Sequence, residues 1–163
     1  MAPMFDFSPD PNGSKADLYR DLLAAASALT DGERDGVANM ANVAALLGEF
    51  LPSCNWTGFY RMVNGELVLG PFVGRPACIR IPVGVGVCGA AAETGQTQLV
   101  DDVHAFPGHI ACDAQSRSEL VVPIKQAGQV IAVIDLDSPD LAFFDEEDRD
   151  GIEALAAMLA DRI

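Results

Sequence analysis

Apolar residues recur every three or four positions in three stretches of the chain, and this spacing is typical of helices with one buried face. The stretches are residues 15–29, 33–50 and 145–163. The apolar positions of the first two are Leu18, Leu22, Ala25 and Leu29, then Val37, Met40, Val43, Ala44, Leu47 and Phe50. We expect Pro52 to end the second helix, and the acids that open the third to stabilise its first turn.

Between the second and third helices the pattern becomes that of β-hairpins. Residues 56–70, "WTGFYRMVNGELVLG", predict two strands around Asn64-Gly65, because both turn residues tolerate positive φ. Residues 119–138, "ELVVPIKQAGQVIAVIDLDS", predict a second hairpin with Gly128 near its turn.

Shorter elements lie between the two hairpins. Residues 77–83 and 97–100 each predict a strand, and "GVCGAAAET" predicts a short helix ended by Gly95. A long polar loop follows over residues 101–118, and loops of this length in compact domains are more often functional than idle.

Helices at both ends and antiparallel hairpins between them predict an α+β fold, with one antiparallel sheet flanked by helices. The chain of 163 residues is long enough for one self-sufficient core. We assign residues 15–163 to a single domain. Residues 1–14, rich in Pro, Asp and Asn, are predicted to form a flexible arm that carries Phe5 and Phe7.

The net charge of −14 makes nucleic acid and anionic membranes unfavourable partners and favours a small, cationic ligand. The sequence shows neither a signal peptide nor an apolar stretch of membrane-spanning length. We therefore expect a cytoplasmic protein whose cysteines act as thiols or transient disulfides.

Two nucleotide- or ion-binding patterns are present but lack their structural context. Gly84, Gly86 and Gly89 match the dinucleotide fingerprint, yet no second βαβ half follows, so tight turning of the chain is the better interpretation. The acidic run 145–150 lacks the spacing and central glycine of a calcium loop.

A zinc site is the third candidate. Its ligands would come from Cys54, Cys78, Cys88 and Cys112, together with His104 or His109. No two cysteines have the two-to-four-residue spacing that structural zinc sites favour, and a loop histidine more often bonds to backbone. We therefore expect no metal.

The cysteines are also candidates for thiol chemistry. Cys88 lies at the start of a predicted helix, where backbone N–H groups favour a thiolate, and Cys78 precedes it by ten residues. Cys112 sits in the polar run "GHIACDAQSRSEL", unlike a buried cysteine. Cys54 is better interpreted as a small core residue, and for the other three both interpretations stay open.

Residues 70–124 resemble the free methionine-(R)-sulfoxide reductases, small single-domain members of the GAF family. The resemblance rests on three cysteines, in "ACIRI", "GVCG" and "GHIACD", which ligand-binding GAF domains of signalling proteins generally lack. It continues through "WTGFY" and "VIAVIDLDS" and covers roughly residue 17 to the C-terminus.

The resemblance implies a role for each matching residue. Cys112 would be the nucleophile, Cys78 the resolving thiol and Cys88 a second resolving candidate. Trp56, Tyr60, Glu119, Asp135 and Asp137 would bind the substrate. The family also implies a homodimer that uses thioredoxin as external reductant and needs no bound cofactor.

These residue types suit the reduction of a free amino-acid sulfoxide. Asp135 and Asp137 are two apart, so a strand places both on one face, where crowding raises at least one pKa and would let that acid donate a proton. From the residues alone, a solvated strand end with two ordinary aspartates is the preferred interpretation. Trp56 and Tyr60, four apart, share a face in the same way. The alternative function is a GAF sensor that binds a small ligand without turnover.

Overall fold

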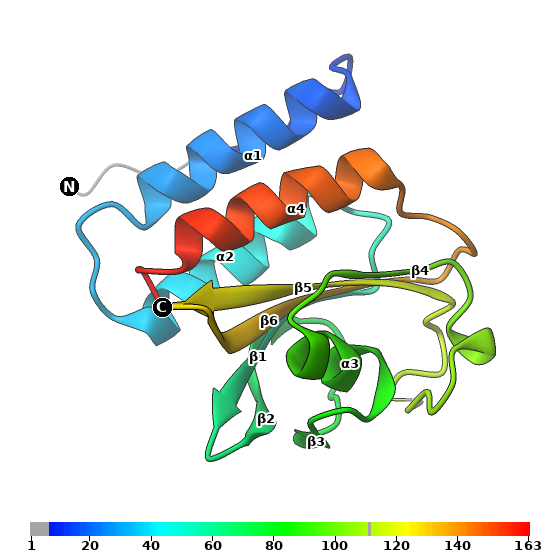
Figure 1. Cartoon of the computed structure of the whole chain (residues 1–163). Coiled ribbons are helices and arrows are strands. Elements are labelled where there is room, and N and C mark those ends of the chain that lie inside the picture. The colour runs from blue at the N-terminus through cyan, green and yellow to red at the C-terminus, as the bar shows by residue number, and fades with distance from the viewer. Residues whose placement is uncertain (1–6, 111) are drawn as a thin grey trace.

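The computed structural model describes residues 7–110 and 112–163, which form a curved sheet between two helical layers (Figure 1). The sheet has six strands in the order β3-β2-β1-β6-β5-β4, and each neighbouring pair is antiparallel. Helices α1, α2 and α4 cover one face, and α3 covers the other. The α+β fold predicted from the sequence is confirmed.

The helices begin where side chains satisfy free backbone N–H groups. Ser14 and Asp145 each form a capping box, and Asp35 accepts a hydrogen bond from the amide of Ala38. Because Asp35 is this cap, the second helix starts three residues later than the apolar pattern predicts. The four helices are α1 Lys15–Leu29, α2 Gly36–Phe50, α3 Gly86–Thr94 and α4 Glu146–Leu159.

Both predicted hairpins are present. Their turns place Asn64 and Gly65, and then Ala127 and Gly128, at positive φ. The strand expected over residues 77–83 is reduced to three residues, because only that part pairs with β2. The strands are β1 Trp56–Val63, β2 Glu66–Val73, β3 Arg80–Pro82, β4 Gln98–Val100, β5 Ser118–Gln126 and β6 Gln129–Ser138.

The alternation of side chains along the central strands builds two cores, one on each face of the sheet. Phe59 and Ile134 pack with the three long helices, whereas Tyr60 and Val133 pack with α3. The first core is the larger. The second is smaller and contains polar groups, so it is where a site can open.

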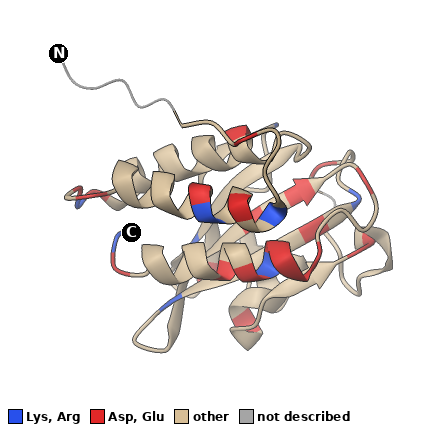
Figure 2. Cartoon of the chain, turned by 90° about the horizontal axis from the view of Figure 1, so that it is seen from above, with Lys and Arg blue, Asp and Glu red and all other residues tan. Residues whose placement is uncertain are grey.

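Helices α1 and α4 are joined by a polar contact within an otherwise apolar layer. The buried Asp148 accepts hydrogen bonds from the hydroxyl of Tyr19 at 2.6 Å and from Nζ of Lys15 at 2.8 Å. Figure 2 shows the surrounding helical surface, on which acids are more common than bases.

The predicted N-terminal arm is described only from Phe7 onward, and Phe7 packs against the larger core. Phe5 lies outside the described residues, so the assignment of residues 1–14 stays a prediction. Among the helices that the structure describes, none has the length and apolar character needed to cross a membrane.

Gly151 in α4 provides a test of this packing. Replacing glycine by alanine within a helix normally stabilises it by about 1 kcal/mol. Here the added Cβ would lie 2.3 Å from ring atoms of Tyr19. We expect Gly151→Ala to lower the free energy of unfolding by about 1–3 kcal/mol, measured by urea denaturation.

The control is Ala154→Gly, at an exposed position of the same helix, which should cost only the propensity difference of about 1 kcal/mol. A stabilised Gly151→Ala protein would show that the α1–α4 contact is not close-packed.

Candidate active site

A disulfide joins Cys78 to Cys112 across 34 residues of sequence, with their Cα atoms 5.5 Å apart. Cys78 lies just before β3, and Cys112 lies in the long polar loop before β5. Two segments that are far apart in the chain are therefore linked beside the smaller core. This is the pair that the resemblance names as nucleophile and resolving thiol.

Next to the disulfide is a cavity of about 40 Å³, between the sheet and α3. Its walls include seven of the eight residues that the sequence predicts for the site, the exception being Cys78. The seven are Trp56, Tyr60, Cys88, Cys112, Glu119, Asp135 and Asp137. A cavity of this size has room for about two or three water molecules.

Strand register explains why the acids meet. Across the sheet Asp137 pairs with Trp56 on β1 and with Glu119 on β5, and Asp135 pairs with Gly58 and Val121. Directly opposed residues in antiparallel strands place their side chains on the same face. Three carboxyl groups and an indole ring thus gather on the face that α3 covers.

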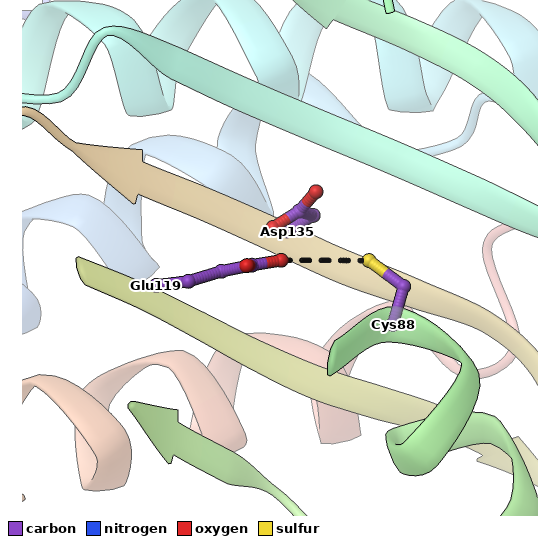
Figure 3. Close-up of side chains that lie close together, drawn as sticks. All are labelled: Cys88, Glu119 and Asp135. Carbon is purple, nitrogen blue, oxygen red and sulfur yellow. Dashed lines mark hydrogen bonds between the residues drawn. The ribbon is translucent and has the colours of Figure 1, made fainter. Parts of the chain in front are cut away.

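Cys88 of α3 points into this group of acids (Figure 3). Its thiol donates a hydrogen bond to Oε1 of Glu119, with sulfur and oxygen 3.8 Å apart. Cys88, Glu119 and Asp135 are 4%, 7% and 6% exposed. Oδ1 of Asp135 is buried without a hydrogen-bond partner among the described residues.

Burial determines the protonation of these groups. Loss of solvent raises the pKa of Glu119 and of Asp137 well above the usual range, and the nearby charge of Asp135 raises both further. Burial also raises the pKa of Asp135, to about 6, but the neighbouring Glu119 carboxyl and Cys88 thiol limit the rise. Asp135 is therefore the acid that ionises most readily, and burial favours the protonated forms of Glu119 and Asp137.

Of the two interpretations left open for Cys88, a helix-start thiolate and a small buried residue, its surroundings favour the second. Cys88 is the third residue of α3, but it is buried and faces carboxyl groups. Burial raises the pKa of its thiol well above the usual value, and the charges of Asp135 and Glu119 add to the shift. These effects outweigh the favourable end of a short helix.

The aromatic residues form one wall and also hold the Cys78 segment. The rings of Trp56 and Tyr60 lie 5.8 Å apart at 20°. The indole N–H of Trp56 donates to the carbonyl of Arg75 at 3.1 Å, and the hydroxyl of Tyr60 donates to the carbonyl of Cys78 at 2.9 Å. Both side chains thus combine an apolar surface with a hydrogen bond that positions the backbone near the disulfide.

The sequence analysis missed Asn55, Asp113 and Ser116. Nδ2 of Asn55 donates to Oδ2 of Asp113 and to Oγ of Ser116, each at 3.1 Å. Asp113 and Ser116 line the cavity, and Ser116 hydrogen-bonds to Asp137. The polar run after Cys112 was the available signal, but the contact with Asn55, on a distant segment, has no sequence signature.

Comparison with known proteins identifies the family to which the chain belongs. The GAF domain model matches residues 16–163. The chain is 49% identical to the free methionine-R-sulfoxide reductase of Escherichia coli over 146 residues, which cover 90% of this chain and 88% of that protein. The chain belongs to the free methionine-R-sulfoxide reductase family of GAF domains.

Solved structures agree with this assignment. The free methionine-R-sulfoxide reductase from Neisseria meningitidis, in complex with its substrate, superposes with a TM-score of 0.91 at 46% identity, covering 98% of this chain and 94% of that one. A putative GAF sensor protein from Burkholderia vietnamiensis has a TM-score of 0.89 at 55% identity, covering 92% and 96%.

Cys54, His104 and His109, the remaining candidate residues of the sequence analysis, lie in three different surroundings in this GAF domain. Cys54 packs with the larger core, and burial raises its pKa to about 12. A zinc site built from the four cysteines is therefore not formed, because Cys78 and Cys112 are bonded to each other and Cys54 lies on the opposite face. His109 lines the cavity, where burial lowers its pKa, and His104 is exposed.

The turn into α3 packs tightly, as expected, with Gly84 before the helix and Gly86 and Gly89 in its first turn. The amide of Gly84 donates to the carbonyl of Gly89 at 2.8 Å, and a Cβ on Gly89 would lie 2.6 Å from the carbonyl oxygen of Pro82. These glycines allow α3 to approach the sheet, which brings Cys88 to the acids.

Thiol titration tests this arrangement in the GAF domain. In oxidised protein the two free thiols, Cys54 and Cys88, should react slowly with iodoacetamide, because burial disfavours both thiolates. After treatment with dithiothreitol, peptide mapping should find fast alkylation at Cys112. Fast alkylation of Cys88 before reduction would contradict the buried cluster.

Proposed function

We propose that the protein reduces free methionine-(R)-sulfoxide to methionine. The observation that carries the proposal is the Cys78–Cys112 disulfide beside a cavity walled by acids and aromatic rings. Membership of a family of reductases supports the substrate. The direct test is to incubate the protein with dithiothreitol and each sulfur epimer of the free amino acid, and to measure the methionine formed.

The thiol of Cys112 carries out the first step. As thiolate it attacks the sulfoxide sulfur while the sulfoxide oxygen is protonated; methionine leaves, and the oxygen remains on Cys112 as a sulfenic acid. The thiol of Cys78 then attacks the sulfenic sulfur, forming the disulfide and releasing water. Thioredoxin, as external dithiol, returns both cysteines to thiols, so no bound cofactor is needed.

The buried acids divide two tasks. Asp135 ionises most readily, so we assign it to the substrate ammonium. Burial favours the protonated forms of Glu119 and Asp137, so we assign the donation of a proton to the sulfoxide oxygen to one of these two acids. Trp56 and Tyr60 provide the apolar wall for the methyl and thioether part of the substrate.

Oxidation and attack on the substrate exclude each other in this scheme, because the sulfur of Cys112 that attacks the sulfoxide is bonded to Cys78 in the disulfide. Reduction by thioredoxin must therefore free the thiol of Cys112 before the next turnover. We also propose a homodimer in the cytoplasm, where reduced thioredoxin is maintained; analytical ultracentrifugation tests the dimer.

A non-catalytic GAF sensor is the alternative function. It shares the pocket but needs neither a paired nucleophile nor a resolving thiol, and here two cysteines are already joined beside the pocket. A protein that binds methionine sulfoxide but forms no methionine with dithiothreitol would be a sensor.

Removing each candidate resolving thiol separates their roles. With thioredoxin, Cys78→Ser should produce about one methionine per enzyme and then stop at the sulfenic acid. Cys88→Ser should continue to turn over. The Cys88 thiol is hydrogen-bonded to Glu119, whereas Cys78 is the cysteine that forms the disulfide with Cys112. The measurement is methionine per enzyme over time, with Cys54→Ser as a control. Stalling of Cys88→Ser alone would reverse the assignment.

Substrate discrimination tests the role of Asp135. The N-acetyl derivative of methionine-(R)-sulfoxide lacks the ammonium, so pairing with buried Asp135 is lost, and kcat/KM should be lower by at least about a hundredfold. Asp135→Asn should raise KM for the free amino acid and remove most of this discrimination.

The matched control is Asp140→Asn, which makes the same change at an exposed position just after the same strand. If Asp135→Asn lowers kcat/KM equally for both substrates, another group holds the ammonium.

A further inference from the structure

Three potential metal ligands converge in the smaller core, on α3, β5 and β6. Cys88 Sγ, a carboxylate oxygen of Glu119 and one of Asp135 all lie within 4.8 Å of one another. Their side chains point toward a common centre (Figure 3). In a tetrahedral zinc site, bonds of about 2.3 Å to sulfur and 2.1 Å to oxygen place those two atoms about 3.6 Å apart. The observed 3.8 Å between Cys88 Sγ and Glu119 Oε1 needs little contraction.

A second observation shows that this cluster lacks a ligand. Asp135 is more than nine-tenths buried, yet its Oδ1 has no hydrogen-bond partner among the described residues. A buried carboxylate oxygen without a partner is costly, and a cation placed beside it would offset the cost. All three residues line the cavity of about 40 Å³, so a small ion can reach them from the pocket.

We propose that Cys88, Glu119 and Asp135 form a binding site for one divalent cation of the zinc type, with a fourth coordination position open to the cavity. One thiolate and two carboxylates favour zinc or cobalt over magnesium and calcium, which prefer oxygen ligands alone. Binding displaces the thiol proton of Cys88 and the carboxyl proton of Glu119, and both are released to solvent.

This site differs from the four-cysteine site considered from the sequence. Of those cysteines it uses Cys88 alone, and its other ligands are acids on two strands. The expectation of a metal-free protein was based on the spacing between cysteines. That spacing carries no information about a site with one cysteine and two acids.

The cation would occupy the position assigned to the substrate ammonium, and this consequence rests on the proposed function. Both ligands bring positive charge to Asp135, so they compete for it. Zinc should then inhibit the reductase reversibly, by competition with the sulfoxide.

The binding test uses wild-type protein oxidised at Cys78–Cys112, in which Cys54 and Cys88 are the free thiols. Titration with Co²⁺ should produce a near-ultraviolet thiolate-to-cobalt band that saturates at one ion per chain and is abolished by Zn²⁺. Absence of the band in wild-type protein would overturn the proposal.

Variants identify the ligands. Cys88→Ser should remove the band, whereas the matched control Cys54→Ser should keep it, because Cys54 packs on the opposite face. Glu119→Gln and Asp135→Asn should each weaken Co²⁺ binding at least about tenfold. Near-ultraviolet circular dichroism of each apo-variant checks that it is folded. A band that survives in folded Cys88→Ser would overturn the site, as would unchanged affinity in both acid variants.

Competition is measured in the Cys78→Ser/Cys112→Ser double variant, which cannot form the disulfide or turn over. Free methionine-(R)-sulfoxide should raise the apparent Kd for Co²⁺ in proportion to its concentration. If Co²⁺ binds through Cys88 but the sulfoxide does not displace it, the cation site stands and the placement of the ammonium at Asp135 is overturned.

Discussion

The site depends on the burial of three carboxyl groups and a thiol on one face of an antiparallel sheet. Such groups lose solvation without gaining a basic partner among the described residues, so they lower the stability of the fold. The larger core on the opposite face, formed by three long helices, offsets this cost. The two faces thus have separate functions, one for stability and one for chemistry.

Burial also gives the acids their chemical properties. In water all three carboxyls would be ionised at neutral pH and the thiol would be an ordinary cysteine. Between the sheet and α3, burial favours the protonated forms of Glu119 and Asp137, and Asp135 is the first of the three to ionise. One pocket therefore contains proton donors and a charge that attracts cations, although all three side chains are acids on neighbouring strands.

The sequence predicts the parts of this arrangement that arise from local preferences. Asn64-Gly65 and Gly128 mark the hairpin turns, and two-residue spacing places Asp135 and Asp137 on one face. The register that brings Glu119 opposite Asp137 depends on how the strands pair. The sequence placed Glu119 in the site only through the family resemblance. The two interpretations of Cys88 stayed open because its position in the helix is visible in the sequence, whereas its burial against acids is not. The hydrogen bonds from Asn55 to Asp113 and Ser116 were missed because they join segments that are far apart in the sequence.

A pocket of this kind explains how one fold can serve both sensing and catalysis. The sheet and α3 create a buried, acid-lined space that attracts a small cationic ligand, and a sensor requires no more than this. Reduction also requires that two sulfur atoms meet beside that space, and here one of them lies on the long polar loop before β5. Here Tyr60 and Trp56 hold the backbone around Cys78 by hydrogen bonds, while Asn55 holds the polar residues that follow Cys112. These anchors lie on β1 or directly next to it. Because β1 pairs with β6, the strand that carries Asp135 and Asp137, it positions the ligand pocket and the disulfide relative to each other. The meeting of the two sulfur atoms therefore depends on the loops that carry Cys78 and Cys112, whereas the grouping of the acids depends on the sheet.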